Sequence, residues 1–198
     1  DTKISFDTNI IHFDTANEER LRIDSNGKLL VNHSTARIIA GGNSLVQVEA
    51  VDSTGRVSIV QNRNEAEGAP FLSLGKSRGT SVGSNTVVQS GDTLGTVAFA
   101  GADGTDLSTS AVQIVAQVDG TPGSDDMPGR LIIKTTADGA SSATERLRIT
   151  RIGKIGINQS TPDTMLHLAG DPDASIGGAV IRLENTTAMG QDELVGAV

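Results

Sequence analysis

The chain has 198 residues, a formal net charge of −8 and no run of Lys or Arg, which argues against nucleic acid as a partner because phosphate neutralisation dominates that affinity. It contains no Cys, which excludes disulfides and thiolate metal sites, and no apolar run reaches the ~18 residues that cross a membrane as a helix. With 23 Gly, four Phe and no Trp or Tyr, the core must be filled by small aliphatic side chains. Such a composition suits a narrow core repeated along an axis better than one thick globule.

Short segments with β-branched residues or Leu at alternate positions predict strands along nearly the whole chain. They lie at residues 45–50, 56–60, 71–74, 94–99, 112–118, 130–135, 146–149, 154–157, 165–168 and 180–184. In the clearest of them, 112–118, apolar residues alternate with glutamines, and only Val115 interrupts the polar side. The best helix candidate, 63–68, is a single polar turn. The sequence therefore predicts an all-β protein, as a sandwich, a barrel or a solenoid-like fibre.

The chain contains an internal repeat. The pentapeptide Glu-Arg-Leu-Arg-Ile occurs at residues 19–23 and again at 145–149, an offset of 126, and the similarity continues from 24–32 to 150–158. Each copy predicts a hairpin that turns at a glycine. The Asn26-Gly27 pair is a strong signal for a two-residue turn because both residue types tolerate positive φ.

Three further pairs of stretches are similar: residues 10–15 with 132–136 and, more weakly, 71–76 with 180–185 and 91–97 with 190–198. We therefore expect a module of about 126 residues repeated along a filament, with the chain starting late in one module and stopping early in the next. The predicted parts are 1–36, the end of one module with its hairpin; 37–90, a β-rich spacer; 91–162, a β module ending in the second hairpin; and 163–198, the start of a truncated further module.

Such hairpins need partners from outside the single chain. Isolated two-stranded hairpins are marginal in water, and their open edges and apolar faces must be covered. The strands have no strict rung of 20–30 residues, as a single-chain β-helix would show. The spacing favours several chains around one axis, commonly three. We therefore predict an elongated, intertwined homotrimer built of β-hairpin and β-prism modules similar to a triple β-helix.

The second hairpin and the residues after it resemble a known family. Residues 145–149, 153–158, 160–162 and 166–168 are similar to a motif of bacteriophage tail fibres that often precedes an endosialidase-type intramolecular chaperone. Residues 101–106, 118–123, 126–131 and 136–140 are similar to fibres of phages that infect marine bacteria. The resemblance covers most of 90–170 and returns over 10–32, while 33–70 resembles nothing known.

The resemblance implies a homotrimeric, distal tail appendage that serves host attachment, located in the virion tail and assembled in the host cytoplasm. Its partners would be copies of itself, other tail proteins, and a host surface polysaccharide or outer-membrane receptor. A chaperone domain would follow Val198, and the chain carries no serine–lysine cleavage motif of that domain.

Two groups of carboxylates are candidate sites. Residues 103–106, Asp-Gly-Thr-Asp, supply ligand types that Ca²⁺ prefers, but the pattern also fits a polar turn in which Asp bonds its own backbone, and it lacks the long loop and closing Glu of an EF-hand. The pairs Asp125 with Asp126 and Glu65 with Glu67 could serve glycoside hydrolysis. Solvated loop charge is the stronger interpretation, and the chain has no Trp or Tyr on which a sugar ring would stack.

The remaining polar residues give weaker signals. His12, His33 and His167 have no metal-ligand spacing, no Gly-x-Ser-x-Gly motif occurs, and Gly41-Gly42 and Gly177-Gly178 predict turns and not phosphate loops. Four arginines share the outward strand face, where a basic stripe for anionic glycan competes with simple pairing to carboxylates such as Glu19 and Glu145. These arginines are Arg20, Arg22, Arg146 and Arg148.

The sequence thus predicts a mechanical function, a shaft segment that presents a distal receptor-binding tip, with no enzyme activity, no cofactor and no metal. Three alternatives remain open. The chain could bind host glycan directly through loops 77–93 and 119–129, since loops on a rigid scaffold carry recognition. It could be a capsule-degrading tailspike domain, or the stalk of a bacterial trimeric adhesin, which has a similar composition.

Overall fold

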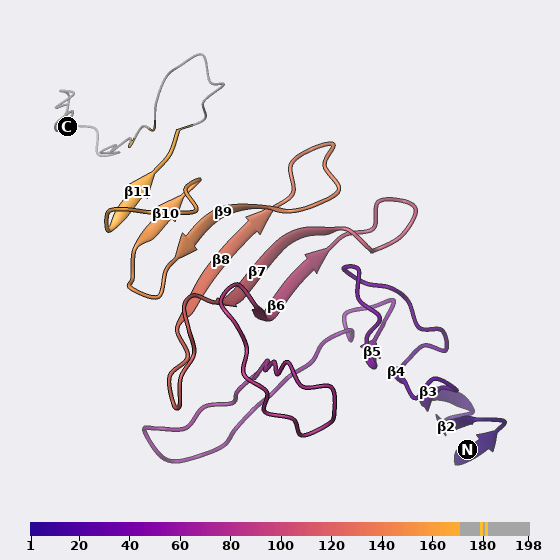
Figure 1. Cartoon of the computed structure of the whole chain (residues 1–198). Helices are drawn as coiled ribbons and strands as arrows, with labels where there is room; N and C mark the ends of the chain where they lie inside the picture. Colours follow the sequence, from indigo (N-terminus) through magenta and orange to yellow (C-terminus); the bar gives the residue numbers. More distant parts are fainter. Residues whose placement is uncertain (171–178, 180, 182–198) are drawn as a thin grey trace.

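The computed structural model describes residues 1–170, 179 and 181, and these form two β-sheets with no helix among them. The all-β prediction is confirmed. In Figure 1 the five-stranded sheet and the last strand of the six-stranded sheet lie at opposite ends of the molecule, with long loops between β5 and β6. No helix in the described residues is long and apolar enough to span a membrane.

The N-terminal sheet has five strands in sequential order. They are β1 (Thr2–Asp7), β2 (Ile10–Thr15), β3 (Glu18–Ile23), β4 (Leu29–Val31) and β5 (Val46–Val48). The first four pair antiparallel through short turns, whereas β5 returns through residues 32–45 to pair parallel with β4. The sheet is thus a meander with a parallel edge strand.

The second sheet has six strands, also in sequential order. They are β6 (Thr93–Ala100), β7 (Ser110–Val118), β8 (Gly129–Thr135), β9 (Thr144–Ile149), β10 (Ile155–Ile157) and β11 (Leu166–Leu168). All pairs are antiparallel except β10 and β11, which are parallel. Figure 1 shows this sheet in the middle of the molecule.

The β2–β5 and β8–β11 units share one topology. The turn glycines Gly27 and Gly153 have φ of 76° and 80°, and each N–H donates to the carbonyl three residues earlier at 2.9 Å. Positive φ is available to glycine without steric cost. The predicted hairpins at 19–32 and 145–158 are therefore present as β3–β4 and β9–β10.

The β2–β3 and β8–β9 connections differ in length, so a sequence comparison with a constant offset does not align all of the equivalent strands. The β2–β3 turn is residues 16–17, whereas β8 and β9 are joined by residues 136–143. The register makes Ile11 equivalent to Leu131, since each pairs with the last residue of the next strand. The predicted match of 10–15 with 132–136 was therefore displaced by one or two residues.

The strands predicted at 56–60 and 71–74 are not strands in this structure. Their alternating side chains fit a strand, but no other segment of the described chain pairs with their main chain. The strand predicted at 180–184 and the weaker repeats that reach residue 185 and beyond lie outside the described residues. The segment boundaries at 36, 90 and 162 stay predictions.

The buried core is small. Val115 and Ile132 pair directly across β7 and β8, and Leu30 lies in β4 between the residues that face it from β3 and β5. The polar residue Gln47 is also buried. Its side-chain amide is satisfied there, because it accepts from the N–H of Arg37 at 3.0 Å and donates to the C=O of Arg37 at 2.8 Å. Most other aliphatic strand residues remain accessible, which directs attention to the sheet faces.

Candidate functional site: an apolar assembly surface

One face of the six-stranded sheet is apolar on every strand. Residues opposite one another on neighbouring strands lie on the same face, so the strand register alone defines this surface. Its members are Val97, Phe99, Val112, Ile114, Ala116, Leu131, Ile133, Leu147, Ile149, Ile155, Ile157, Leu166 and Leu168. We call this set the second apolar face.

The second apolar face is accessible in the single chain. Phe99 and Leu166, on the two edge strands, are 53% and 52% exposed, and Ile114 on an inner strand is still 38% exposed. A monomeric soluble protein rarely exposes contiguous apolar patches above a few hundred Å². A surface that crosses six strands without a covering layer is typical of an interface.

The N-terminal sheet repeats the arrangement. Its first apolar face contains Ile4, Phe6, Ile11, Phe13, Leu21, Ile23, Leu29, Val31, Val46 and Val48. Phe6 is 78% exposed, and Ile4 and Val46 are each 58% exposed. Alternation in a single strand predicts an apolar side for that strand. Only the register shows that these sides join into one continuous face on each sheet.

The opposite faces carry the few buried apolar residues Leu30, Val115 and Ile132 together with ordered ion pairs. Arg22 donates to Glu19 from Nε and Nη2, the latter at 2.6 Å, and Arg148 donates to Glu145 at 2.5 and 2.7 Å. The bond from Arg22 lowers the pKa of Glu19, and the bond to Glu145 raises that of Arg148. Two of the four arginines of the predicted basic stripe are therefore neutralised by carboxylates.

A β-bulge makes these pairs possible. The register shifts between Phe13 and Asp14 and between Ile133 and Lys134, so one extra residue of β3 and of β9 is accommodated. In a regular strand, residues three apart point to opposite faces, whereas a bulge re-aims a side chain. Sequence patterning assumes regular alternation and could not place Glu19 beside Arg22.

The other two arginines of the predicted stripe, Arg20 and Arg146, donate from Nε to Thr15 and Thr135, each at 3.0 Å. Arg20 also pairs with Glu18 at 2.9 Å. The stripe is therefore a set of local contacts, with Glu–Arg pairs inside β3 and β9 and Arg–Thr bonds to the neighbouring strands β2 and β8.

The three histidines lie apart, each beside an oxygen of its own, although the geometry at His167 Nδ1 makes no hydrogen bond. His12 Nδ1 is 2.8 Å from Glu19, His33 Nδ1 is 3.1 Å from the carbonyl of Thr35, and His167 Nδ1 is 2.8 Å from Asp163. Within the described residues, no group of three or more His, Asp or Glu side chains is placed to hold a metal ion.

The acidic candidates sit in turns. Asp103 accepts from the N–H groups of Asp106 and Thr105 at 3.0 and 2.8 Å, which lowers its pKa. This is the self-bonded turn that competed with a Ca²⁺ site in the sequence. Glu65 pairs with Arg63, and Asp126 forms a turn with Gly123.

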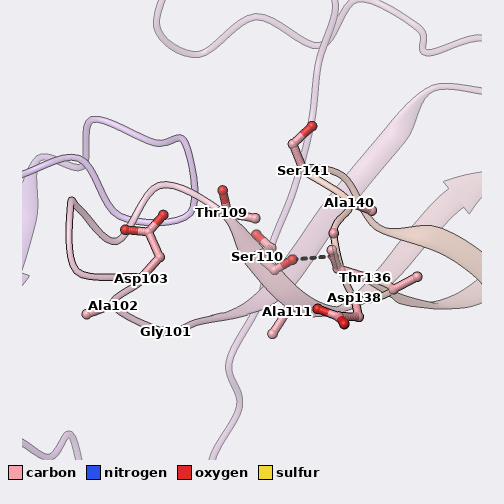
Figure 2. A pocket seen from close by; sticks show the side chains of 12 residues that line it. Gly101, Ala102, Asp103, Thr109, Ser110, Ala111, Thr136, Asp138, Ala140 and Ser141 are labelled. Atoms are coloured by element: carbon pink, nitrogen blue, oxygen red, sulfur yellow. Dashed lines mark hydrogen bonds between the residues drawn. The ribbon is translucent and has the colours of Figure 1, made fainter.

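Two hollows lie between loops. The larger, about 500 Å³, is lined by β6–β7 and β8–β9 loop residues, where Thr136 donates to the carbonyl of Ser110 at 2.6 Å (Figure 2). The smaller, about 320 Å³, brings the predicted recognition loops 77–93 and 119–129 together, with Asn85 and Thr86 from one and Pro122 and Met127 from the other. Neither hollow is lined by an aromatic side chain.

The turn at Gly41-Gly42 contacts the second sheet. Ile39 bridges to Gly42 within the turn and to Leu107 in the β6–β7 loop, and Ala40 donates to the carbonyl of Leu107 at 2.8 Å. The predicted turn at Gly41-Gly42 is therefore present, and it also joins the N-terminal part of the chain to the β6–β7 loop. The Gly177-Gly178 pair lies outside the described residues.

The fold has known neighbours, although the sequence matches no family model and no curated protein. It is similar to the carboxy-terminal domain of the bacteriophage T5 L-shaped tail fibre, with a TM-score of 0.60 at 15% identity, over 92% of this chain and 75% of that one. It is also similar to that domain with its intramolecular chaperone, with a TM-score of 0.57 at 13% identity, over 94% of this chain and 55% of the other. The all-β fold is thus similar to that of a phage tail fibre domain.

Proposed function

We propose that this chain is a structural shaft segment of a bacteriophage tail fibre that assembles as a homotrimer, with both apolar faces turned toward a common axis. The observation that carries the proposal is the pair of continuous, accessible apolar faces on the two sheets. The tail fibre neighbours support the same role.

Three copies fit these sheets better than two. Strands lie about 4.8 Å apart, so a sheet of six strands is about 24 Å wide. Three such sheets arranged as a triangular prism place each sheet about 7 Å from the axis, a gap that aliphatic and Phe side chains fill. A prism also brings the edge strand β6 of one copy near β11 of the next, whereas two stacked sheets leave all edges open.

The role is mechanical. Repeated inter-chain packing gives a stiff spacer that links other tail proteins to a distal receptor-binding tip, and no reaction is required. The localisation that follows is the virion tail, with assembly in the host cytoplasm. Polar faces with paired charges would then form the outer surface of the shaft.

Light scattering combined with small-angle X-ray scattering tests the proposal. The expected result is a mass near three times the chain's 20.4 kDa and an elongated scattering profile. A dimer would replace the prism by a sandwich, and a stable monomer would overturn the assembly and reopen a single-chain function.

The smaller hollow favours a second candidate, direct contact with host surface glycan. It lies between the two loops that the sequence singled out, and it offers Lys76, Asn85 and Thr86 as polar partners. Purified host polysaccharide should bind the wild-type chain, and binding should weaken in Asn85→Ala if the hollow is the contact. Unchanged binding in that variant, or none in the wild type, would reject this candidate.

A further inference from the structure

The chain between the two sheets contains a stretch with no main-chain partners of its own. In the part of the chain that the structure describes, no N–H or C=O of residues 57–77 is hydrogen-bonded to another protein group. Two segments without regular secondary structure, 56–61 and 70–74, flank a polar turn around Glu65 and Gly68. We call these two segments the linker strands. Main-chain polar groups in a folded chain are nearly always paired when they leave water.

The side chains of the linker strands are those of a strand with a covered face. Val57 and Ile59 alternate with Ser58, and Leu72 and Leu74 alternate with Ser73. Within these segments Val57 is 78% exposed, Phe71 80% and Leu72 75%. β-branched and aromatic residues at period two are the residues that pack on a pleated surface, so an isolated, solvated loop is a poor account of this composition.

The chain that joins β5 to β6, which we call the linker, contains both linker strands. It is attached near the apolar faces at both ends. At its start, Glu49 donates to the carbonyl of Val31 at 3.2 Å, next to the last residue of the first apolar face. At its end, Leu74 lies over Gly95, where a Cβ on the glycine would be 2.8 Å from that of Leu74. Gly95 pairs with Ala116 and so belongs to the side of the second apolar face. The linker therefore leaves and rejoins the sheets where the trimer axis would run.

We propose that the linker strands of each copy pair through their main chains with the linker strands of neighbouring copies, so that the chains cross one another between the two prisms. This inference rests on the proposed trimer. Around a three-fold axis the same segment of each copy lies at the same height, and each offers the donors and acceptors that the others lack. Pro70, which has no N–H, stands at the first position of its linker strand, where a ladder tolerates it.

Hydrogen exchange measured by mass spectrometry on the whole purified chain tests this pairing. The amides of residues 57–61 and 71–74 should exchange about 100-fold more slowly than those of the turn at 62–69, at a level similar to β7. A trimer whose linker strands exchange as fast as that turn would overturn the inference and leave the trimer intact. A monomer in light scattering would overturn both.

Proline variants supply a second readout. Ser58→Pro and Ser73→Pro each remove one N–H from a linker strand, and the matched control Asn64→Pro lies in the polar turn. We expect the two strand variants, but not the control, to lower the thermal midpoint of the trimer and to speed exchange of chains between labelled and unlabelled trimers. Equal thermal midpoints and equal rates of chain exchange in all three variants would contradict inter-chain pairing. If the two strand variants do not form trimers while the control does, the result supports the pairing.

Discussion

Gly156 in β10 occupies a position where no side chain fits. Its equivalent in the first sheet is Leu30, which is fully buried. The β10–β11 connection, residues 158–165, is shorter than residues 32–45 between β4 and β5, and it brings the carbonyl of Gln159 over Gly156 so that an added Cβ would overlap it. The two sheets therefore fill the same position in different ways, one with a Leu side chain and one with main chain.

The substitution Gly156→Ala should therefore destabilise the protein, because the backbone of residue 159 must move to admit the methyl group. We expect a loss on the order of 1–3 kcal/mol, as for other overpacking changes. The control is Gly101→Ala, where a Cβ meets nothing within 4 Å and φ is ordinary. Urea unfolding of both variants at one protein concentration measures the effect, and equal midpoints would show that the loop yields freely.

Asp92, directly before β6, gathers the loop that precedes this strand through its carboxylate. Its carboxylate accepts from Arg78 at 2.6 and 2.7 Å and from the N–H of Gln89 at 3.0 Å, with Lys76 at 3.7 Å. The bonds from Arg78, followed by that from Gln89, hold the pKa of Asp92 far below its ordinary value of 3.8. The folded state therefore binds this proton less readily than the unfolded state.

The sign of the pH dependence follows from that difference. Stabilisation by the Asp92 carboxylate is complete above the unfolded-state pKa, near 3.8, and is lost as pH falls below it toward the folded-state pKa. Asp92→Asn should unfold at a lower temperature than wild type at pH 7, and the gap should narrow between pH 4 and pH 2. Asp125→Asn, in an exposed turn, is the control. A gap that stayed constant with pH would rule out the ionised pair as its source.

At the level of elements, the two hairpins could be predicted from the sequence, whereas the parallel pairing of β5 with β4 and of β11 with β10 could not. Gly27 and Gly153 close turns that short-range chemistry determines, so the β3–β4 and β9–β10 pairs could be predicted. The parallel return of β5 and β11 depends on loops of different length, and their residues give no local signal of a parallel partner. The linker strands show a second limit, because an alternating pattern indicates that a segment can pair as a strand but does not identify its partner.

The same reasoning applies to the candidate site. An apolar side on 112–118 was visible in the sequence, but the joining of all strands into one face depends on the register. The bulges beside Asp14 and Lys134 could not be predicted, since nothing in a short segment specifies where an extra residue is absorbed. The Glu–Arg pairs that neutralise the predicted basic stripe follow from those bulges.

The two faces of β7 allow a matched test of the apolar assembly surface. Ile114 lies on the second apolar face, and Gln113, its neighbour, lies on the opposite face. Ile114→Asp should abolish or strongly weaken the trimer, since an unpaired charge in an apolar interior is costly. Gln113→Asp should leave assembly intact because position 113 lies on the opposite face, directly across from the cation Lys134. Light scattering of both variants gives the result, and a trimeric Ile114→Asp would place the interface elsewhere.

For the whole molecule, the likeness to a tail fibre domain at 15% identity is physically reasonable. The fold needs an alternating pattern that keeps one face apolar, and a one-residue slip would turn that face outward. Many sequences satisfy such a pattern with different aliphatic residues. Short strands of Val, Ile and Leu with a few Phe residues meet the requirement without Trp or Tyr, which accounts for the unusual composition of the chain.

The same requirement couples folding to association. Each sheet alone buries few side chains, among them Val115, Ile132 and Leu30, so in the proposed trimer most of the apolar stabilisation would come from contacts between copies. When only the assembled state is stable, the midpoint of unfolding depends on protein concentration. Each tenfold dilution weakens an association step by about 1.4 kcal/mol, and a trimer has two such steps. We therefore expect the thermal midpoint to fall measurably with each dilution.

Heating the chain over a hundredfold range of concentration, at two scan rates, measures this dependence. The two rates are needed because slow, irreversible unfolding makes an apparent midpoint depend on scan speed and would conceal the effect of concentration. If the midpoints from both rates agree and still do not change on dilution, each chain is stable by itself. The apolar faces would then require another explanation than assembly. A midpoint that falls with dilution in wild type, and lies lower still in Ile114→Asp, would attribute the stability of the shaft to those faces.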